Sequence, residues 1–266
     1  STDVVTIDGG SDGGSDGGGD GGSDGGGDGG SDGGGDGGSD ASVTVTGTAL
    51  DVASFTPVAE GLCIHALDPT PVLSGGAPDV LASSTVGAAG AYSLEGVVPP
   101  DLGMLLLVQD CAAEGTVMPS ATGVSAGSYS GWVDGDVVAD TSALVINIAV
   151  AGGIDASLAA AGYSGSVLVD GMTFGFVFDN AGAPVDGATM TCGSCTPYYA
   201  DGDSADGLYT TGGTVNAATS AAGNGNWIVP AATLTTYQPE HVDYTFTSSP
   251  LAGLPAMAVI AAFYAE

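Results

Sequence analysis

The sequence predicts an all-β protein: two tandem antiparallel β-sandwiches, preceded by a glycine- and aspartate-rich tract and a short N-terminal strand. Short runs of β-branched, aromatic and small residues are separated by turns of Gly, Pro and Asn, a spacing typical of sandwiches. One segment alone, near Ile154–Ala161, has a helical pattern, and we expect Asp155 to cap it and Gly162 to end it. The length of 266 residues suits two domains once the tract is set aside.

Composition divides the chain into five parts. Residues 1–7 hold the β-prone run "DVVTI", and residues 8–40 contain only Asp, Gly and Ser, with an Asp at every fourth position. Such a tract has too little apolar surface for a core, so we expect a tether that reaches about 100 Å when extended. Residues 41–112 are expected to form the first sandwich, residues 113–164 a connecting region with the short helix, and residues 165–266 the second sandwich.

Individual strands are expected where apolar and polar residues alternate or where apolar runs are short. In the first sandwich these are "SVTVTGTAL" (42–50), "GLCIHAL" (61–67), "AGAYSLEGV" (89–97) and "GMLLLVQDC" (103–111). In the second they are "TFGFVFD" (173–179), "TMTC" (189–192), "GNWIVP" (225–230), "VDYTFTS" (242–248) and "AMAVIAAFYAE" (256–266).

The charge balance excludes several functions. Lys and Arg together number 0, against 31 Asp and Glu residues. Nucleic-acid backbones are bound mainly by Lys and Arg, so a nucleic-acid partner is excluded, and anionic membrane surfaces would repel the chain. Catalysis through an arginine finger or a lysine Schiff base is impossible, and so is any Lys or Arg ion pair. The acidic surface suits a saline or divalent-rich exterior, where cations screen it.

Several features point to export. No run of 18 apolar residues occurs, so no transmembrane helix is expected, and the start at Ser1 without Met suggests a mature product whose signal segment is gone. The chain is therefore expected to be secreted, at a cell surface or in an outer envelope. In that setting four cysteines suggest disulfides, and proximity in sequence favours Cys63–Cys111 and Cys192–Cys195 among the three pairings. A redox or zinc role for Cys192-x-x-Cys195 is disfavoured, because no cationic neighbour or further ligand pattern accompanies it.

Two stretches repeat one pattern of strand, Pro/Gly turn, strand, variable loop and aromatic strand. The pattern resembles the carboxypeptidase regulatory-like, or transthyretin-like, β-sandwich domain, in two copies on an exported bacterial surface protein. The matching positions are Gly47, Pro57, Gly61, Thr85, Gly90 and Tyr92 in the first copy, and Gly175, Pro184, Gly187, Ser220, Gly225 and Trp227 in the second. The resemblance implies non-catalytic modules that act as spacers, adhesion units or binding accessories.

Acidic loops are the candidates for cation binding. "DGDSADG" places Asp201, Asp203 and Asp206 together, where carboxylate oxygens suit Ca²⁺, although the acid that ends a helix–loop–helix calcium site is missing. "WVDGDVVAD" offers Asp134, Asp136 and Asp140 in the same way. The alternative in both cases is a solvated acidic loop. No cofactor other than Ca²⁺ is suggested.

The remaining chemistry-bearing residues point to packing rather than catalysis. His65 and His241 are far apart, and no Gly-x-Ser-x-Gly signature accompanies them, so no enzyme is expected. Trp132, Trp227 and the adjacent Tyr198–Tyr199 pair could stack on a carbohydrate, but Trp227 suits a core position. Adjacent strand residues face opposite sides, so at most one of the two tyrosines would face a ligand.

Two hypotheses for function follow. In the first, the chain is a structural protein that self-associates into a surface filament, with Val4, Val5 and Ile7 adding as a strand to the sheet of another copy. In the second, it is an outer-envelope lipoprotein whose tract is a stalk presenting a carbohydrate- or protein-binding module. A weaker third reading is a Ca²⁺-dependent accessory domain of a secreted enzyme complex.

Overall fold

The computed structural model describes residues 41–112, 114–125, 132–200, 209–211, 215, 226–231, 234–251 and 253–266. Its first half contains β1 (Val43–Asp51), β2 (Cys63–Asp68), η1 (Thr70–Ser74), β3 (Asp79–Thr85), η2 (Ala88–Gly90), β4 (Ala91–Val97), β5 (Met104–Gln109), β6 (Val117–Met118), β7 (Ser120–Val124) and β8 (Val137–Asn147). Then follow α1 (Ile148–Ala160), α2 (Val167–Asp170), β9 (Met172–Phe178), β10 (Thr189–Thr191), β11 (Tyr198–Ala200), β12 (Tyr209–Thr211), β13 (Asn226–Pro230), β14 (Thr235–Glu240), β15 (Ser249–Leu251) and β16 (Ala258–Tyr264). The all-β class with sandwich-like packing of sheets is confirmed.

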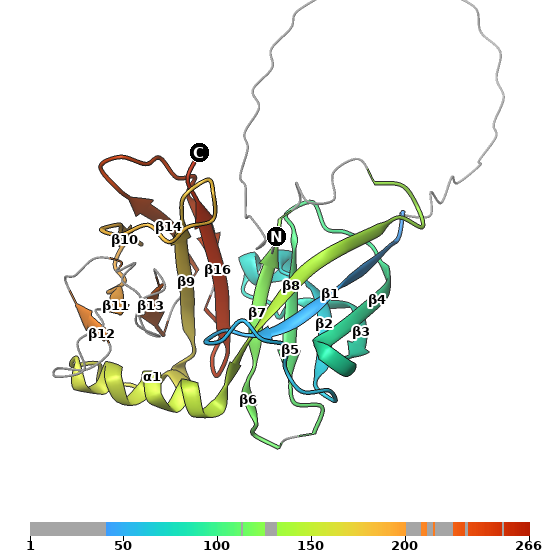
Figure 1. The fold of residues 1–266 in the computed structure, drawn as a ribbon, viewed down its shortest axis with the longest axis horizontal. Helices are drawn as coiled ribbons and strands as arrows, with labels where there is room; N and C mark the ends of the chain where they lie inside the picture. The colour runs from blue at the N-terminus through green and yellow to red at the C-terminus, as the bar shows by residue number, and fades with distance from the viewer. Residues whose placement is uncertain are drawn as a thin grey trace, which may run out of the picture.

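The first half packs two sheets face to face (Figure 1). One sheet has the order β4-β1-β8-β6, and the other side is formed by β3, β2, β5 and β7. At the start of β1 burial alternates, with Val43 and Val45 buried, while the adjacent Ala49 and Leu50 are buried in different cores on the two faces of the strand. The core between the sheets includes Val45, Ile64, Leu94 and Leu106, all fully buried.

The second half has a three-stranded sheet, β10-β14-β15, that packs against the strands β12-β11-β13-β9-β16. Trp227, Tyr237 and Phe263 fill the space between them, with the Trp227 ring stacked on Tyr237 at a centroid distance of 5.3 Å. The opposite face of β9 and β16 lies in a core that also contains residues of α1, β1 and β8, and every residue of β9 is buried. This explains why β9 is apolar almost throughout rather than alternating.

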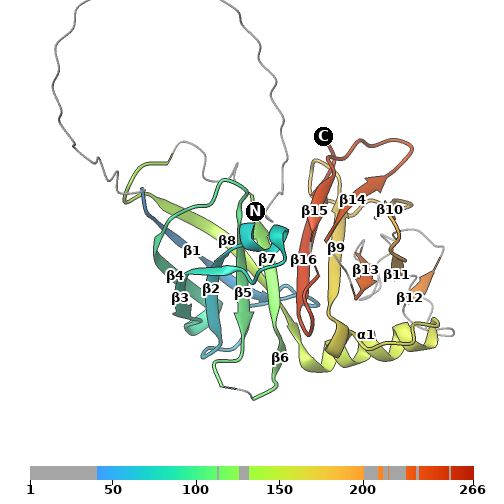
Figure 2. The same ribbon diagram turned by 180° about the vertical axis from the view of Figure 1, so that it is seen from behind.

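One sheet runs through both halves. The strands that follow one another across it are β12-β11-β13-β9-β16-β7-β5-β2-β3, so that β16 of the second half pairs with β7 of the first. The pairing is parallel and joins Ser120, Ala121 and Thr122 to Ala258, Val259 and Ile260. Figure 2 shows β7 and β16 at the centre of the molecule, with one half on each side.

The stretch 113–164 holds more than the expected helix. The strands β6, β7 and β8 lie in it, and β8 pairs in parallel with β1 over most of its length. A parallel pairing joins strands that are far apart in the sequence, so no local sequence pattern predicts it. The division of the chain into units at residues 112 and 165 stays a prediction.

The helix was correctly located, but its start was not. Helix α1 begins at Ile148, and the side chain of Asn147 caps it by accepting the Ala149 N–H at 2.9 Å. Asp155 is not the cap: it lies within the helix and accepts the Val167 N–H at 2.7 Å, at the start of α2. Gly162, with a φ of 96°, follows the last turn as expected.

One expected strand was misplaced. "VDYTFTS" (242–248) contributes only an isolated bridge at Phe246, and the strand of this region is β15, which contains Pro250. A proline is tolerated there because β15 lies at the edge of its sheet. Strand β3, which was not predicted from the sequence, is a second edge strand, and none of its residues is fully buried.

Candidate interaction surfaces and cavities

Six of the predicted site residues lie outside the part of the chain that the structure describes. They are Val4, Val5 and Ile7, expected to act in assembly, and Asp201, Asp203 and Asp206, expected to bind Ca²⁺. Both expectations therefore remain predictions. The positions Ser220 and Gly225 of the repeated pattern also lie outside it.

Each half contains one disulfide. The Cys63–Cys111 bond is confirmed: it joins the first residue of β2 to the second residue after β5, with a Cα–Cα distance of 4.9 Å. These two strands are antiparallel partners, so the bond ties neighbouring strand ends together. The structure also joins Cys192 and Cys195 across the turn that follows β10. Neither cysteine pair is available as a free thiol.

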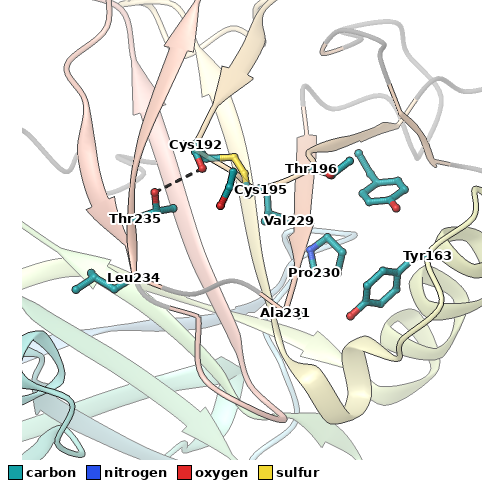
Figure 3. A pocket seen from close by; sticks show the side chains of 11 residues that line it. Tyr163, Cys192, Cys195, Thr196, Val229, Pro230, Ala231, Leu234 and Thr235 are labelled. Atoms are coloured by element: carbon teal, nitrogen blue, oxygen red, sulfur yellow. Dashed lines mark hydrogen bonds between the residues drawn. A yellow bond between two sulfur atoms is a disulfide. The ribbon is translucent and has the colours of Figure 1, made fainter.

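A cavity of about 410 Å³ lies beside the Cys192–Cys195 bond (Figure 3). Hydroxyl groups from Tyr163, Ser194, Thr196 and Thr235 line it together with the edges of Val229, Pro230 and Leu234. The Thr235 hydroxyl donates to the Cys192 carbonyl at 3.5 Å, which holds β14 against the disulfide turn. The described lining residues include no carboxylate and no imidazole.

Tyr163 is the one lining residue of this cavity with a perturbed pKa. Burial raises the pKa of the Tyr163 phenol, and its hydrogen bond to Asp170 at 2.7 Å raises it further. The same bond, with the Ser166 N–H, lowers the pKa of the Asp170 carboxyl. The phenol is thus kept protonated and anchors the α1–α2 turn, which is a structural role.

A second cavity, of about 530 Å³, lies beside Cys111 and contains four carboxylates, those of Asp51, Glu60, Asp110 and Glu114. Two of them already serve the backbone. Asp51 accepts the N–H groups of Ala53 and Ser54, while Asp110 accepts the Thr116 hydroxyl and two backbone N–H groups.

The ionisation of Asp110 follows from this arrangement. The slight burial of the Asp110 carboxyl raises its pKa, but the bonds from the Thr116 hydroxyl, Thr116 N–H and Val117 N–H together outweigh that and lower it. The Asp110 carboxylate therefore keeps its negative charge, in the loop between β5 and β6. Within the described residues, no group of three His, Cys, Asp or Glu side chains is placed to hold a metal ion.

In the "WVDGDVVAD" loop, two of the three carboxylates suggested for a cation already have hydrogen-bond partners, and cation binding there stays a prediction. Asp134 accepts both the N–H and the hydroxyl of Ser42 at 3.0 Å, bonds that lower the pKa of the Asp134 carboxyl. Asp136 accepts the Val133 N–H at 3.0 Å, and Asp140 occupies a left-handed conformation with φ 59°. These hydrogen bonds hold the turn and fix the residue that precedes β1.

The two histidines have structural partners and lie in different halves. His65 bonds to the Ser83 hydroxyl at 2.8 Å through Nδ1, and burial lowers the pKa of its imidazole. In His241, Nδ1 accepts the Asp243 N–H at 3.0 Å, which leaves Nε2 to donate to the Asp186 carbonyl at 3.0 Å. Both imidazoles therefore bridge neighbouring segments.

The aromatic residues suggested for carbohydrate stacking are mostly buried. Trp227 is 0% exposed and lies in the core, as expected. Tyr198 and Tyr199 face opposite sides of β11, also as expected, but each is buried in a different core. Trp132 packs against the core of the first half. None of these rings forms an open stacking surface.

Open sheet edges are the remaining surface feature. In the described chain, β3 pairs with β2 alone, and Val80 on β3 is 62% exposed. The first part of β8 pairs with β1 alone, and Val137 there is 56% exposed. Strand edges with unpaired backbone groups are templates for the addition of another strand.

Comparison with known proteins identifies no family. No family model matches the chain, and no curated protein matches it. Among solved structures, the shaft pilin SpaA from Lactobacillus rhamnosus GG is 9% identical, with 85% of this chain and 98% of that one covered, at a TM-score of 0.27. The Bacillus anthracis TIE protein is 9% identical, with 85% and 34% covered, at a TM-score of 0.25. A streptococcal ancillary pilin is 11% identical, with 85% and 62% covered, at 0.24. Similarity at this level supports no conclusion about function.

Proposed function

We propose that the chain is a non-enzymatic structural protein of the cell exterior that self-associates into a filament. The open edge of β3 carries the proposal, because it offers backbone groups that a strand from another copy can pair with. The segment containing Val4, Val5 and Ile7 is the proposed strand, and residues 8–40 are its tether. Ca²⁺ bound at Asp201, Asp203 and Asp206 is the one cofactor that this proposal retains.

Two further observations support a structural role. The His, Tyr and Asp side chains that could carry chemistry are engaged in turns, caps and strand contacts in the described residues. A chain with no Lys or Arg cannot form Lys or Arg ion pairs between subunits, so main-chain pairing is a suitable means of association. Strand addition supplies hydrogen bonds without any positive charge.

The test compares two deletions of equal length. Removal of residues 1–7 is expected to abolish assembly and leave a folded monomer, since the sandwiches lie elsewhere. Removal of residues 9–15 shortens the tether by the same number of residues and is expected to leave assembly intact. Electron microscopy and light scattering measure assembly, and circular dichroism measures folding.

Normal polymerisation of the chain lacking residues 1–7 would contradict strand addition by this segment. A native chain that stays monomeric at high concentration and high salt would contradict self-association altogether. That second result would favour the alternative in which the tract is a stalk and the sandwiches bind a carbohydrate or a surface protein.

A further inference from the structure

Exposed apolar side chains lie together at one corner of the first half, where β1 and β8 begin. Val133 is 64% exposed, Val137 is 56% exposed and Val98 is 39% exposed. Val133 lies in the segment before β8, Val137 is the first residue of β8, and Val98 follows the last residue of β4. These three residues are called the valine cluster.

Strand pairing places two of the three valines on one face of the sheet. Val43 and its antiparallel partner Val97 are both buried in the core of the first half. Side chains alternate between the two faces along a strand, so Thr44 and Val98, which follow those residues, face outward. Val137 is the parallel partner of Thr44 and therefore shares the outer face.

The turn before β8 brings the third valine to the same corner. The Gly135 N–H donates to the Ser42 carbonyl at 2.8 Å, and Asp134 accepts the Ser42 N–H at 3.0 Å. Val133, which precedes Asp134, thus lies close to the residue before β1. Figure 1 shows the beginnings of β1 and β8 side by side, on the side of the first half away from the second. The cluster therefore lies where the chain enters the first half.

The valine cluster is an unused apolar surface in the described chain. More than half of the Val133 side chain and of the Val137 side chain faces the solvent. Single exposed apolar residues are common on proteins, whereas several at one place are typical of a contact site.

The N-terminal part of the chain supplies an apolar segment within reach of this surface. Residues 1–7 contain Val4, Val5 and Ile7, and residues 8–40 join them to residue 41, which comes directly before the corner. The composition of residues 8–40 predicts a flexible tether, and a coil of that length spans about 30 Å. A tether of this kind holds its two ends at an effective concentration of about 1 mM.

We propose that the apolar side chains of residues 1–7 pack against the valine cluster of the same chain. The contact closes the tract into a loop and occupies the segment that joins subunits in the proposed filament. It is therefore autoinhibitory, because a subunit must release the segment before it can add to the β3 edge of another copy. The docking stands on the cluster and the tether alone, whereas its effect on assembly rests on the proposed function.

The tether favours docking within one chain over docking on another copy. At micromolar protein, the chain's own segment is about a thousandfold more concentrated at the cluster than the segments of all other copies. Strand addition supplies main-chain hydrogen bonds that the valine cluster does not, so binding between subunits prevails as the protein concentration rises.

Disulfide trapping measures the docking directly. Thr6→Cys places a thiol in the segment, and Ala139→Cys places one on the exposed part of β8, two residues after Val137. Mild oxidation of dilute protein is expected to give a closed monomer at a rate that does not change with protein concentration, and peptide mapping identifies the new bond. Serine at both Val133 and Val137 is expected to slow closure about tenfold, because it removes apolar surface and leaves the tether and both thiols unchanged.

Val242→Ser is the matched control for the loss of an exposed valine. Val242 is 90% exposed but lies in the second half, so its substitution is expected to leave the closure rate unchanged. Circular dichroism and thermal melting check folding, which substitutions of exposed side chains are expected to preserve.

The serine variant without added thiols tests the effect on assembly. Val133→Ser/Val137→Ser is expected to lower the concentration for half-assembly by up to about tenfold, because the segment is no longer withheld from other copies. Light scattering against the native chain and Val242→Ser provides the measurement.

The outcomes separate docking from filament formation. Equal closure rates with and without the two serines, or a rate that rises with protein concentration, would overturn docking within the chain. Slower closure together with unchanged assembly would overturn the autoinhibitory role. A native chain that closes as expected but never assembles would support the docking and contradict the proposed filament.

Discussion

At the scale of single residues, the glycines of the repeated pattern are required by close contacts. A Cβ on Gly175 would lie 2.1 Å from the Trp227 ring, and one on Gly47 would lie 1.8 Å from the Thr141 carbonyl oxygen. Tyr92 completes the second contact by donating to the Thr141 hydroxyl at 2.6 Å, and that hydroxyl donates to the Thr46 carbonyl at 2.8 Å. Burial, which outweighs this hydrogen bond, raises the pKa of the Tyr92 phenol.

Substitution of Gly175 should therefore be destabilising. Gly175→Ala is expected to lower the free energy of unfolding by about 1–3 kcal/mol, because the indole must move in a packed core. Gly153→Ala is the matched control: Gly153 lies in α1 with nothing within 4 Å of its Cβ position, and alanine there is expected to add up to about 1 kcal/mol. Urea denaturation followed by circular dichroism measures both. Equal effects of the two substitutions would contradict this account.

At the scale of elements, the two disulfides differ in the loop that each one closes. Cys63–Cys111 spans 48 residues and joins two strands of the first half, while Cys192–Cys195 spans 3 residues within one turn. A crosslink stabilises mainly by restricting the unfolded chain, and the restriction grows with the length of the loop.

The longer loop should matter more for stability. Replacement of Cys63 and Cys111 by alanine is expected to lower the free energy of unfolding by about 4 kcal/mol, against about 2 kcal/mol for replacement of Cys192 and Cys195. Thermal melting of the two double variants beside the native chain provides the measurement. A larger loss from the Cys192/Cys195 pair would show that the turn does more than close a short loop.

The sequence predicts about half of the described strands and fails where long-range contacts decide. Strands β1, β2, β4, β5 and β9 were predicted because alternation or a short apolar run marks each one. The start of α1 was misjudged because Asp155 resembles a cap, whereas its carboxylate serves α2. The acidic loop at Asp134 resembled a cation site, but the Asp134 carboxylate accepts a hydrogen bond from the backbone N–H of Ser42, 92 residues away in the sequence.

At the scale of the whole molecule, the parallel pairing of β7 with β16, which connects the two halves, could not be predicted from the sequence. Its residues lie more than 130 positions apart, and parallel pairing leaves no signature in either strand. The repeat of Gly, Pro and aromatic residues was visible in the sequence, and the observed pairings give it a register. The whole chain also carries a formal net charge of −31 with no basic side chain, so its carboxylates repel one another both within a subunit and between subunits.

Salt should therefore stabilise the fold and promote assembly together. The Debye length falls from about 30 Å at 0.01 M to about 3 Å at 1 M, so repulsion between exposed carboxylates is largely screened at the higher concentration. We expect the Tm to rise over this range of NaCl and the concentration for half-assembly to fall.

Matched samples separate screening from specific binding. CaCl₂ at equal ionic strength should raise the Tm further only if Asp201, Asp203 and Asp206 bind the ion, and Asp203→Asn should then remove that excess without changing the response to NaCl. Scanning calorimetry gives the Tm, and light scattering gives the assembly point. A Tm that does not change with NaCl would mean that apolar burial and the disulfides outweigh the repulsion at every salt concentration, and that the −31 charge does not limit either the fold or the filament.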